Sequence, residues 1–191
     1  MAYLANSFNT RVVELLKRGG IGFMPTDTIY GLSAVASSQS SVERIYRLKG
    51  RYNNKPFVIL LSSAQQSADI GINPKELETV SNFWPAPISF ICAAPKSLWH
   101  LHRGTKSLAC RIPADKAIAK LILEVGPIVS TSANMHGENP ARSVKEAIAL
   151  FGDKLDFYVD AGTLSGRPST IARITNGKLD IVRQGAWQIP L

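Results

Sequence analysis

Polar side chains that suit an anionic ligand follow several apolar stretches of this sequence. The apolar run at 21–24 leads into PTDTIYGL (25–32), and a later run ends at Arg111. STSAN (130–134) follows another apolar run, and GRPST (166–170) precedes the last strand-like segments. Their hydroxyl, amide and guanidinium groups can bind phosphate, ribose or a small polar substrate, but none of these groups is a strong acid or base. This set predicts catalysis by positioning and charge neutralisation rather than through a covalent intermediate.

A cationic turn at 49–56 (KGRYNNKP) separates a helix-like pattern from the apolar run FVILL. Its cations, Lys49, Arg51 and Lys55, suit either a helix C-terminus, whose dipole favours positive charge, or a site for an anion. The other polar segments have ordinary explanations as well: a β-turn, a helix cap and a surface cation. Each ordinary explanation is possible for one segment alone, but a shared site would be absent only if all of them were correct together. A shared site is therefore expected.

The composition limits the classes of protein that fit. The chain has 191 residues and a formal net charge of +8, without a run of five like charges, which indicates a polyanionic partner such as a nucleotide or RNA. No apolar stretch approaches the ~18 residues of a membrane span, and the N-terminus lacks an export signal, so a cytoplasmic location is expected. Cys92 and Cys110 lie in apolar runs without zinc-like spacing, and both are expected to be core residues.

Helix and strand patterns alternate, which predicts a single α/β domain over residues 1–191 with one main sheet. Helices are expected at 10–18, 40–50, 73–84, 114–126 and 143–152, and strands at 21–24, 57–61, 88–94, 107–112 and 127–131. Capping boxes are expected at Ser40 with Glu43 and at Ser143 with Glu146. The pair Asn176-Gly177 predicts a two-residue hairpin turn between strands at 170–175 and 178–183.

The common nucleotide-binding and catalytic signatures are absent from the sequence. GxGxxG after a strand, HExxH and GxSxG do not occur. RGTKS (103–107) imitates the end of a phosphate-binding P-loop, but the earlier glycine is missing and a strand pattern rather than a helix follows. The polar segments at the ends of the predicted strands therefore remain the candidate site, because ligands of open α/β sheets bind beyond strand ends.

Five segments together resemble the YrdC-type threonylcarbamoyl-AMP synthase family in its short, single-domain form. They are PTDTIYGL, LKGRYNNKPFVILL, SLACRIP, STSAN and GRPSTI…IVRQG, in the order and spacing of that family from about Arg11 to Gly185. The resemblance implies a twisted, mixed α/β sheet with flanking helices and a basic concave cleft. It also implies an activity in which L-threonine, bicarbonate and ATP give L-threonylcarbamoyl-adenylate and pyrophosphate, for threonylcarbamoyladenosine modification of tRNA.

Expectations about ligands and partners follow from the same resemblance. ATP would be a substrate, and Mg²⁺ would be bound mainly through the nucleotide phosphates, with no metal ligands from the chain. The product would pass to tRNA-modifying threonylcarbamoyl-transfer proteins, and RNA contact through the basic cleft is a further expectation.

The resemblance assigns site residues position by position. Those implied to be catalytic are Lys49, Arg51 and Arg111. Those implied to bind threonine are Thr28, Arg111, Ser130 and Ser169. Those implied to bind the nucleotide are Arg51, Lys55, Ser107, Ser132, Asn134, Arg142 and Arg183. Tyr30 and Pro56 are implied to shape the pocket.

The sequence departs from the family pattern at a few positions. Several relatives carry a histidine where this chain has Leu60, so one polar contact to threonine is expected to be missing. Asp27 replaces a frequent glutamate, and Asn54-Lys55-Pro56 differs from the Asn-Pro of longer members. The family also contains a sister branch without an assigned activity.

Other functions remain open at this point. One is a non-catalytic RNA-binding module that uses the basic cleft, although the basic segments lack the paired aromatic residues that stack on single-stranded bases. Another is a carbamoyl-adenylate-forming enzyme, because related domains occur in hydrogenase-maturation carbamoyltransferases, which carry additional domains. Salt-dependent RNA affinity with and without ATP, and the mass of the product, distinguish these alternatives from the synthase.

Overall fold

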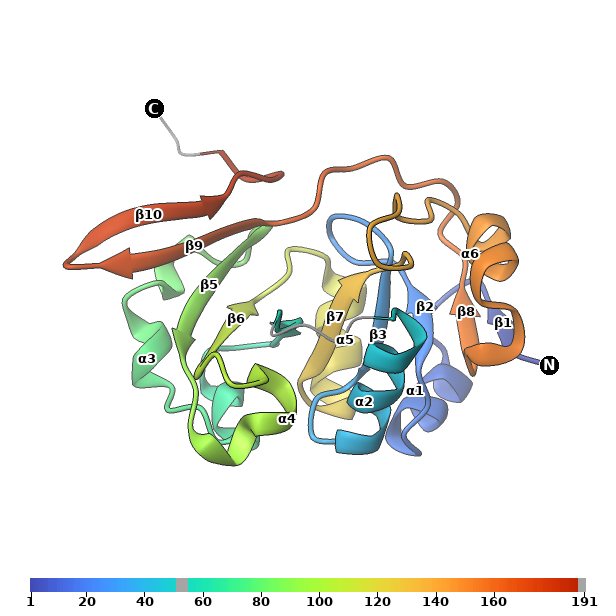
Figure 1. Cartoon of the computed structure of the whole chain (residues 1–191), viewed down its shortest axis with the longest axis horizontal. Coiled ribbons are helices and arrows are strands. Elements are labelled where there is room, and N and C mark those ends of the chain that lie inside the picture. Colours follow the sequence, from blue (N-terminus) through green and yellow to red (C-terminus); the bar gives the residue numbers. More distant parts are fainter. Residues whose placement is uncertain (51–54, 189–191) are drawn as a thin grey trace.

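The computed structural model describes residues 1–50 and 55–188. Within this part of the chain, ten strands form one mixed sheet (Figure 1). In spatial order they are β1 (Tyr3–Ala5), β8 (Phe157–Val159), β2 (Gly22–Met24), β3 (Gly31–Val35), β7 (Ile128–Ser132), β4 (Val58–Leu60), β6 (Ser107–Arg111), β5 (Ile88–Ala93), β9 (Thr170–Thr175) and β10 (Lys178–Arg183). The sheet contains parallel pairs such as β4 with β6 and antiparallel pairs such as β3 with β7, so the expected mixed α/β sheet is confirmed.

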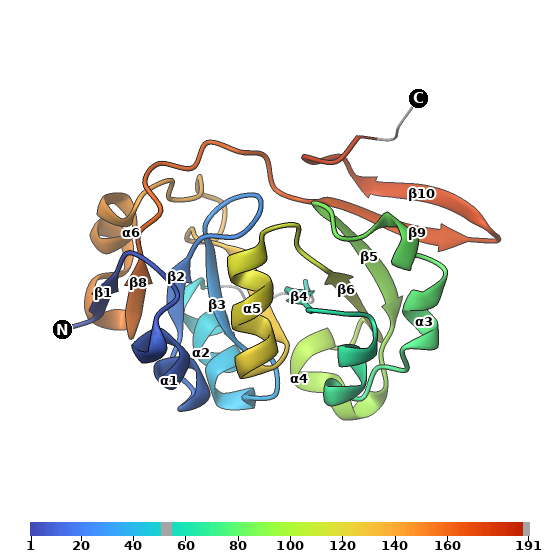
Figure 2. The same cartoon turned by 180° about the vertical axis from the view of Figure 1, so that it is seen from behind.

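Helices cover both faces of the sheet (Figures 1 and 2). They are α1 (Thr10–Lys17), α2 (Gln39–Leu48), α3 (Lys75–Glu78), α4 (Trp99–His102), α5 (Lys116–Val125) and α6 (Val144–Phe151). Buried side chains of α1 and α5 share a hydrophobic cluster with Leu60. Buried side chains of α2, α3 and α6 belong to another cluster, which contains Ile59. Successive residues of β4 thus face opposite layers, as the alternation of a strand requires.

Local signals explain where most helices begin and end. The Asp115 side chain accepts from the N–H groups of Ala117 and Ile118 and caps α5, and Gly126 follows that helix with a φ of 87°. Ser143 accepts from the N–H of Glu146 and begins α6, as predicted.

Within the described residues, no helix combines the length and the apolar composition needed to cross a bilayer.

Two helix predictions are wrong in detail. The helix α2 begins at Gln39, one residue before the expected start, and its N-cap residue makes no side-chain capping bond, so the predicted capping box is not formed. Glu43 pairs instead with Arg103 from another part of the chain. The predicted helix at 73–84 is reduced to α3 and a short 3₁₀ turn, because the Ser81 hydroxyl donates to the Glu78 carbonyl and competes for helical hydrogen bonding.

The sequence did not predict β1, β3 or β8. PTDTIYGL was treated as a loop, but its last residues, Gly31 and Leu32, belong to β3. A Cβ on Gly31 would lie 2.5 Å from Ser130 Oγ on β7, so this glycine permits the close approach of the two strands. The C-terminal hairpin is confirmed, since Asn176 and Gly177 have φ angles of 52° and 74° between β9 and β10.

Candidate active site

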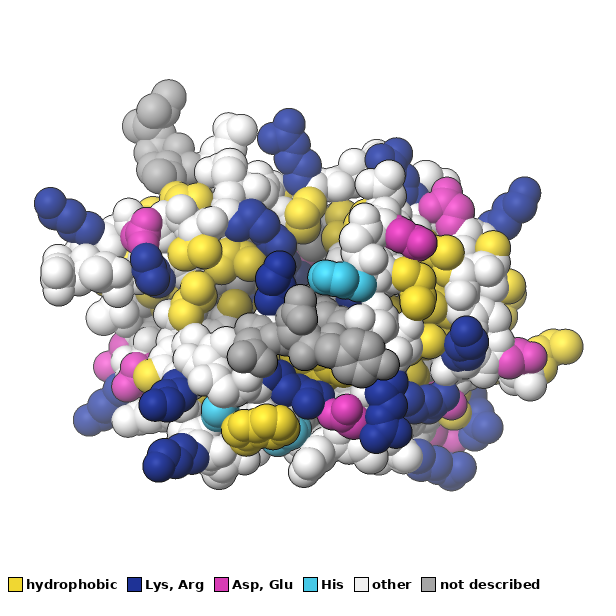
Figure 3. Space-filling view, viewed as in Figure 1, with side chains coloured by type: hydrophobic (Ala, Val, Ile, Leu, Met, Phe, Trp, Pro, Cys, Tyr) yellow, Lys and Arg dark blue, Asp and Glu magenta, His cyan; other side chains and the backbone are white. Residues whose placement is uncertain are grey.

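A pocket of about 160 Å³ lies where the ends of the central strands meet. It is lined by Thr26, Thr28, Ile29, Tyr30, Gly31, Pro56, Phe57, Val58, Arg111, Ser130, Thr131, Ser132, Pro168, Ser169, Ile171 and Arg183. The polar segments that were expected to converge therefore do so. Figure 3 shows lysine and arginine side chains spread over one face of the molecule, with few acidic side chains near its centre.

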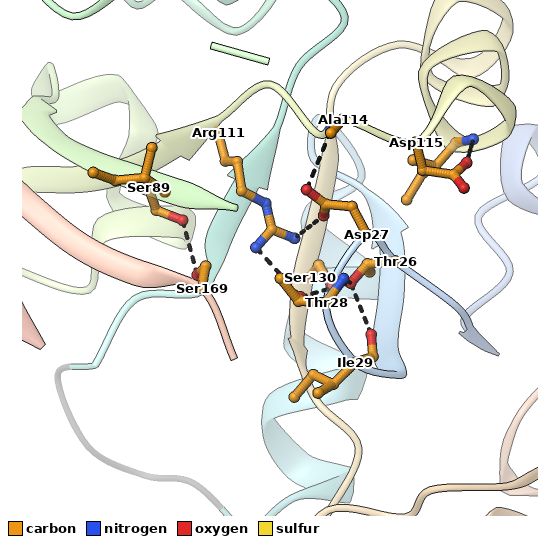
Figure 4. A network of polar contacts seen from close by, with 12 residues as sticks. Thr26, Asp27, Thr28, Ile29, Ser89, Arg111, Ala114, Asp115, Ser130 and Ser169 are labelled. Atoms are coloured by element: carbon orange, nitrogen blue, oxygen red, sulfur yellow. Dashed lines mark hydrogen bonds and ion pairs between the residues drawn. The ribbon is translucent and has the colours of Figure 1, made fainter. Parts of the chain in front are cut away.

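Arg111 lies at the end of β6 and provides a buried cation in this pocket. Its side chain is 4% exposed, and Nη2 lies 3.0 Å from Asp27 Oδ1 in an ion pair. Nη1 lies 3.5 Å from Thr28 Oγ1, which is long for a hydrogen bond, and Nε has no hydrogen-bond partner among the described residues (Figure 4). A buried guanidinium with unused donors is suited to bind an additional anion.

Burial, which disfavours the charged form, lowers the pKa of Arg111, whereas the charge of Asp27 opposes this shift. The positive charge of Arg183 lowers the pKa of Arg111 further. Burial also lowers the pKa of Arg183. A bound carboxylate would reduce both the desolvation cost and the repulsion between these arginines.

Asp27 orients Arg111, although its role was not recognised in the sequence. Its Oδ2 accepts from the N–H of Ala114, 3.2 Å away, so the carboxylate joins the loop before β3 to the segment after β6. Its other oxygen, Oδ1, lies beside Arg111 (Figure 4). The available signal was that Asp27 is the single acidic residue in PTDTIYGL.

The loop before β3 presents the Thr28 hydroxyl through a local turn. The Thr26 hydroxyl donates to the Ile29 carbonyl at 2.7 Å and accepts from the N–H of Thr28 at 3.2 Å. Thr28 Oγ1 lies 2.9 Å from Thr26 Oγ1. This turn fixes the side of the pocket that faces Arg111.

Segment 160–169 runs from β8 to β9 past the loop that precedes β3 (Figures 1 and 2). The Tyr30 hydroxyl donates to the Gly162 carbonyl at 2.8 Å and accepts from the N–H of Ala161 at 2.7 Å. A Cβ on Gly166 would lie 2.4 Å from the Thr28 carbonyl oxygen, so only glycine permits this approach. Tyr30 therefore has the shaping role expected for it.

Ser130 brings a hydroxyl to the pocket from β7, and Ser169 brings one from the residue just before β9. Ser169 Oγ accepts from Ser89 Oγ at 3.0 Å (Figure 4). The Ser169 carbonyl accepts from Arg183 Nη2 at 2.7 Å. Ser130 lies on β7, opposite Ser33 and Val58 on the neighbouring strands. Both Ser130 and Ser169 are buried, which suits a small ligand enclosed by the pocket.

Lys49 is buried immediately after α2, away from the pocket lining. Its ammonium group donates to the Ser132 carbonyl, to the Asn134 carbonyl at 2.8 Å and to Asn134 Oδ1 at 2.7 Å. The carbonyl of Lys49 accepts from the N–H of His136. Ser132 Oγ donates to Asn134 Oδ1 at 2.7 Å. These contacts fix STSAN, so Ser132 reaches the pocket from a segment held by Lys49.

The remaining residues expected at the nucleotide side are not among the described residues that line the pocket. Lys55 and Arg142 are exposed, and Ser107 is half-buried at the start of β6. The backbone N–H of Arg142 donates to Glu146 Oε2 at 2.7 Å. Arg51 lies outside the described residues.

The position of Leu60 corrects an expectation from the sequence. Leu60 is fully buried in the cluster under α1 and α5, and it does not line the described pocket. Val58, the first residue of β4, is the residue of this strand that lines the pocket. The polar contact expected to be missing at Leu60 therefore does not correspond to a gap in this pocket.

A stack of side chains behind the pocket was also not foreseen. Phe57, which lines the pocket, stacks on Tyr46 with 4.0 Å between ring centroids, and the guanidinium of Arg103 lies 3.9 Å from the Tyr46 centroid. The Tyr46 hydroxyl donates to the Lys55 carbonyl at 3.2 Å. The P-loop-like RGTKS thus supplies a structural cation, because Arg103 also pairs with Glu43.

His, Cys, Asp and Glu side chains are the groups of this chain that could hold a metal ion. Within residues 1–50 and 55–188, no three of them come together in a group that could hold an ion. Asp27, the carboxylate paired with the pocket residue Arg111, also accepts from the N–H of Ala114.

The chain with this fold and this pocket of hydroxyl and arginine side chains matches a known protein family. The model of the Sua5/YciO/YrdC family, described as "Telomere recombination", matches residues 14–185. The chain belongs to this family. A threonylcarbamoyl-AMP synthase of Coxiella burnetii is 33% identical over 174 residues, which cover 87% of this chain and 92% of that protein.

Solved structures show the same fold. Pyrococcus abyssi Sua5 in complex with L-threonine has a TM-score of 0.82 and 25% identity over 97% of this chain. This chain spans 57% of that protein's length. Escherichia coli YciO has a TM-score of 0.82 at 20% identity, and the match covers 98% of this chain and 97% of YciO. The YciO comparison supports the fold.

Proposed function

We propose that this chain synthesises L-threonylcarbamoyl-adenylate from L-threonine, bicarbonate and ATP, releasing pyrophosphate, for the threonylcarbamoyladenosine modification of tRNA. Membership of the family and the relative of that activity in C. burnetii support the reaction class. The observation that carries the substrate assignment is the buried Arg111, whose Nε has no hydrogen-bond partner among the described residues and which lines a small pocket with several hydroxyl groups. The volume of about 160 Å³ can accommodate an amino acid.

Threonine binds, in this proposal, with its carboxylate on Arg111. The guanidinium can donate two hydrogen bonds to a carboxylate, and Asp27 holds it in one orientation. The hydroxyls of Thr28, Ser130 and Ser169 surround the remainder of the amino acid. These groups discriminate through hydrogen bonds, since a substrate that leaves a buried hydroxyl unpaired loses binding energy.

The nucleotide lies beside the threonine pocket, toward STSAN and the residues that follow α2. The threonine amine attacks bound bicarbonate, and water leaves to give a carbamate. A carbamate oxygen then attacks the α-phosphate while pyrophosphate leaves. Arg183, Lys55 and Arg142 neutralise phosphate charge, Ser107 and Ser132 donate to phosphate or ribose oxygens, and Arg51 acts with them. Mg²⁺ held by the ATP phosphates would supply further charge neutralisation for the pyrophosphate leaving group.

Lys49 has a supporting role in this proposal. Its ammonium group is engaged by oxygens of Ser132 and Asn134, so it fixes the segment that meets the nucleotide. Positioning of this kind can account for a large rate effect without direct contact between Lys49 and phosphate.

The partners of the reaction follow from the lability of its product. Acyl-adenylates hydrolyse in water, so we propose that the product passes directly to threonylcarbamoyl-transfer proteins acting on tRNA. RNA contact through the basic face is a further proposal (Figure 3), and an RNA affinity that falls steeply with salt and is competed by ATP would support it.

Pyrophosphate release tests the proposed activity. Purified protein is expected to release pyrophosphate when ATP, bicarbonate and L-threonine are all present, and omission of any one should stop the release. Release without threonine, or ATP binding without any release, would contradict the proposal. A panel of amino acids distinguishes threonine use from an activity of the family's sister branch on another substrate.

A further inference from the structure

The chain's two cysteines meet on neighbouring strands, and Cys110 directly precedes the pocket residue Arg111. Cys92 lies on β5 and Cys110 on β6, and their sulfur atoms are 3.8 Å apart. Both are free thiols, and both are buried, as expected from the sequence. The sequence did not show that they touch, because they are separated by a loop and a turn of helix. The proposed synthase reaction does not use either thiol.

The two thiols differ in their access to small molecules. Cys92 is 7% exposed and lines a second cavity of about 290 Å³ between α3, β5 and β9. Cys110 is completely buried behind it. A reagent entering this cavity reaches Cys92 first, and Cys110 is in position to react with the modified Cys92.

The thiols also differ in acidity. A hydrogen bond from Cys110 lowers the pKa of Cys92, although burial acts in the opposite direction. The same interaction and complete burial raise the pKa of Cys110 well above its ordinary value. Cys92 is therefore the better nucleophile of the pair, and Cys110 keeps its proton.

We propose that Cys92 and Cys110 form an oxidation site for hydrogen peroxide. The Cys92 thiolate attacks one peroxide oxygen, the O–O bond breaks, and Cys92 sulfenic acid and water form. The Cys110 sulfur then attacks the Cys92 sulfur, giving a disulfide and a second water. Overall, two thiols lose two electrons and two protons, and one peroxide is reduced to two waters. A dithiol reductant reverses the reaction by thiol–disulfide exchange.

The disulfide would be coupled to the threonine pocket through the strands that carry the cysteines. In the β5–β6 register Cys92 is opposite Leu108 and Phe90 is opposite Cys110, so the thiols are diagonal neighbours. Diagonal Cβ atoms lie roughly 7 Å apart or somewhat less, whereas a disulfide requires about 3.8 Å. Bridging therefore shifts β5 against β6, and Arg111 follows Cys110 directly in the chain.

The chemistry is tested by the mass of the full chain, which does not depend on the proposed function. After treatment with hydrogen peroxide and alkylation under denaturing conditions, the intact chain should have lost two hydrogen atoms and carry no alkyl groups. Dithiothreitol should restore both alkylation sites. Cys92→Ala should abolish the bridge while Cys110 remains reduced. Two alkylated cysteines, a sulfinic acid on Cys92 without a bridge, or a bridge between two chains would overturn the proposal.

The coupling rests on the proposed function and is measured separately. Oxidised protein is expected to lose threonine-dependent pyrophosphate release by roughly 10- to 100-fold, because a displacement of about 1 Å at a positioning group can cost about 100-fold. Cys92→Ala should keep its activity in peroxide. Full activity of the bridged chain would refute the coupling, whereas inactivity of the reduced chain would count against the proposed function alone.

Discussion

Asp27 Oδ1 lies 3.0 Å from Arg111 Nη2, and both side chains are only 4% exposed. The pair joins two segments that are 84 positions apart, the loop before β3 and the end of β6. Charges are rarely buried unless they are paired, so the carboxylate makes it possible to place a guanidinium in the pocket. Asp27 pairs with Nη2 and so orients Arg111, while Nε has no hydrogen-bond partner among the described residues. This relationship is the physical basis of the proposed threonine site.

Asp27→Asn is expected to destabilise the protein, because it leaves the Arg111 charge buried without a counter-ion. Breaking a buried pair costs about 3–5 kcal/mol. L-threonine should recover part of the loss, since its carboxylate supplies the missing negative charge. Thermal unfolding of wild type and variant, with and without threonine, measures this effect. A threonine-induced rise in Tm no larger than that of the wild type would contradict the account.

Arg111→Lys keeps a positive charge but loses the planar fork. We expect the KM for threonine to rise by roughly 10- to 100-fold, corresponding to the ~1.5–3 kcal/mol of a hydrogen bond to a charged group, with a smaller change in the KM for ATP. Arg173→Lys is a matched control, because Arg173 forms an exposed pair with Asp180 on the hairpin. Equal increases in both KM values would argue against a threonine-specific role.

Lys49→Met is expected to lower stability, because oxygens of Ser132 and Asn134 lose their buried donor. Each buried acceptor left unpaired costs about 1–3 kcal/mol. Lys55→Met is the control, because Lys55 is exposed. The urea midpoint of this variant should be unchanged, whereas its KM for ATP should rise. Urea unfolding and steady-state kinetics of both variants separate the roles. An unchanged midpoint for Lys49→Met would show that Lys49 does not hold STSAN.

Leu60→His tests whether a polar contact is missing at the family's histidine position. Leu60 is fully buried between α1 and α5, so the variant should lose about 2–5 kcal/mol of stability, as for other disruptions of a packed core. The KM for threonine should not fall. A stable variant that uses threonine better would place Leu60 at the substrate, contrary to the structure.

Tyr158 gives a prediction for alkaline pH. Burial raises the pKa of Tyr158 from 10.0 to about 12, and its hydroxyl donates to the Gly152 carbonyl at 2.6 Å. The unfolded chain loses this proton at lower pH than the folded chain, so the stabilisation is present below pH 10 and is lost toward pH 12. Tyr158→Phe should therefore show a smaller decline in Tm over this range. Identical declines would contradict the shift.

Much of the site was predictable because it depends on local chemistry. Hydroxyls and arginines at strand ends indicated the polar segments, and the family resemblance implied Thr28, Arg111, Ser130 and Ser169 within them. These residues do meet in one pocket. The Asn176-Gly177 turn was predictable for the same reason, since its φ angles are set by the residues themselves.

Other features depend on contacts between distant segments, which a sequence pattern does not encode. Glu43 was interpreted as part of a capping box, but it pairs with Arg103, 60 positions away. The meeting of Cys92 with Cys110 likewise follows from the β5–β6 register. The apolar side chain of Leu60 indicates that it is buried. The face of the sheet on which it lies depends on the alternation of side chains along β4.

The product of the reaction tests the central claim most directly. Protein incubated with ATP, L-threonine and ¹³C-labelled bicarbonate can be analysed by mass spectrometry. We predict a species with the mass of threonylcarbamoyl-adenylate that carries the label and is lost in Arg111→Ala. A threonine-independent adenylate, an unlabelled product or the same yield from Arg111→Ala would contradict the account.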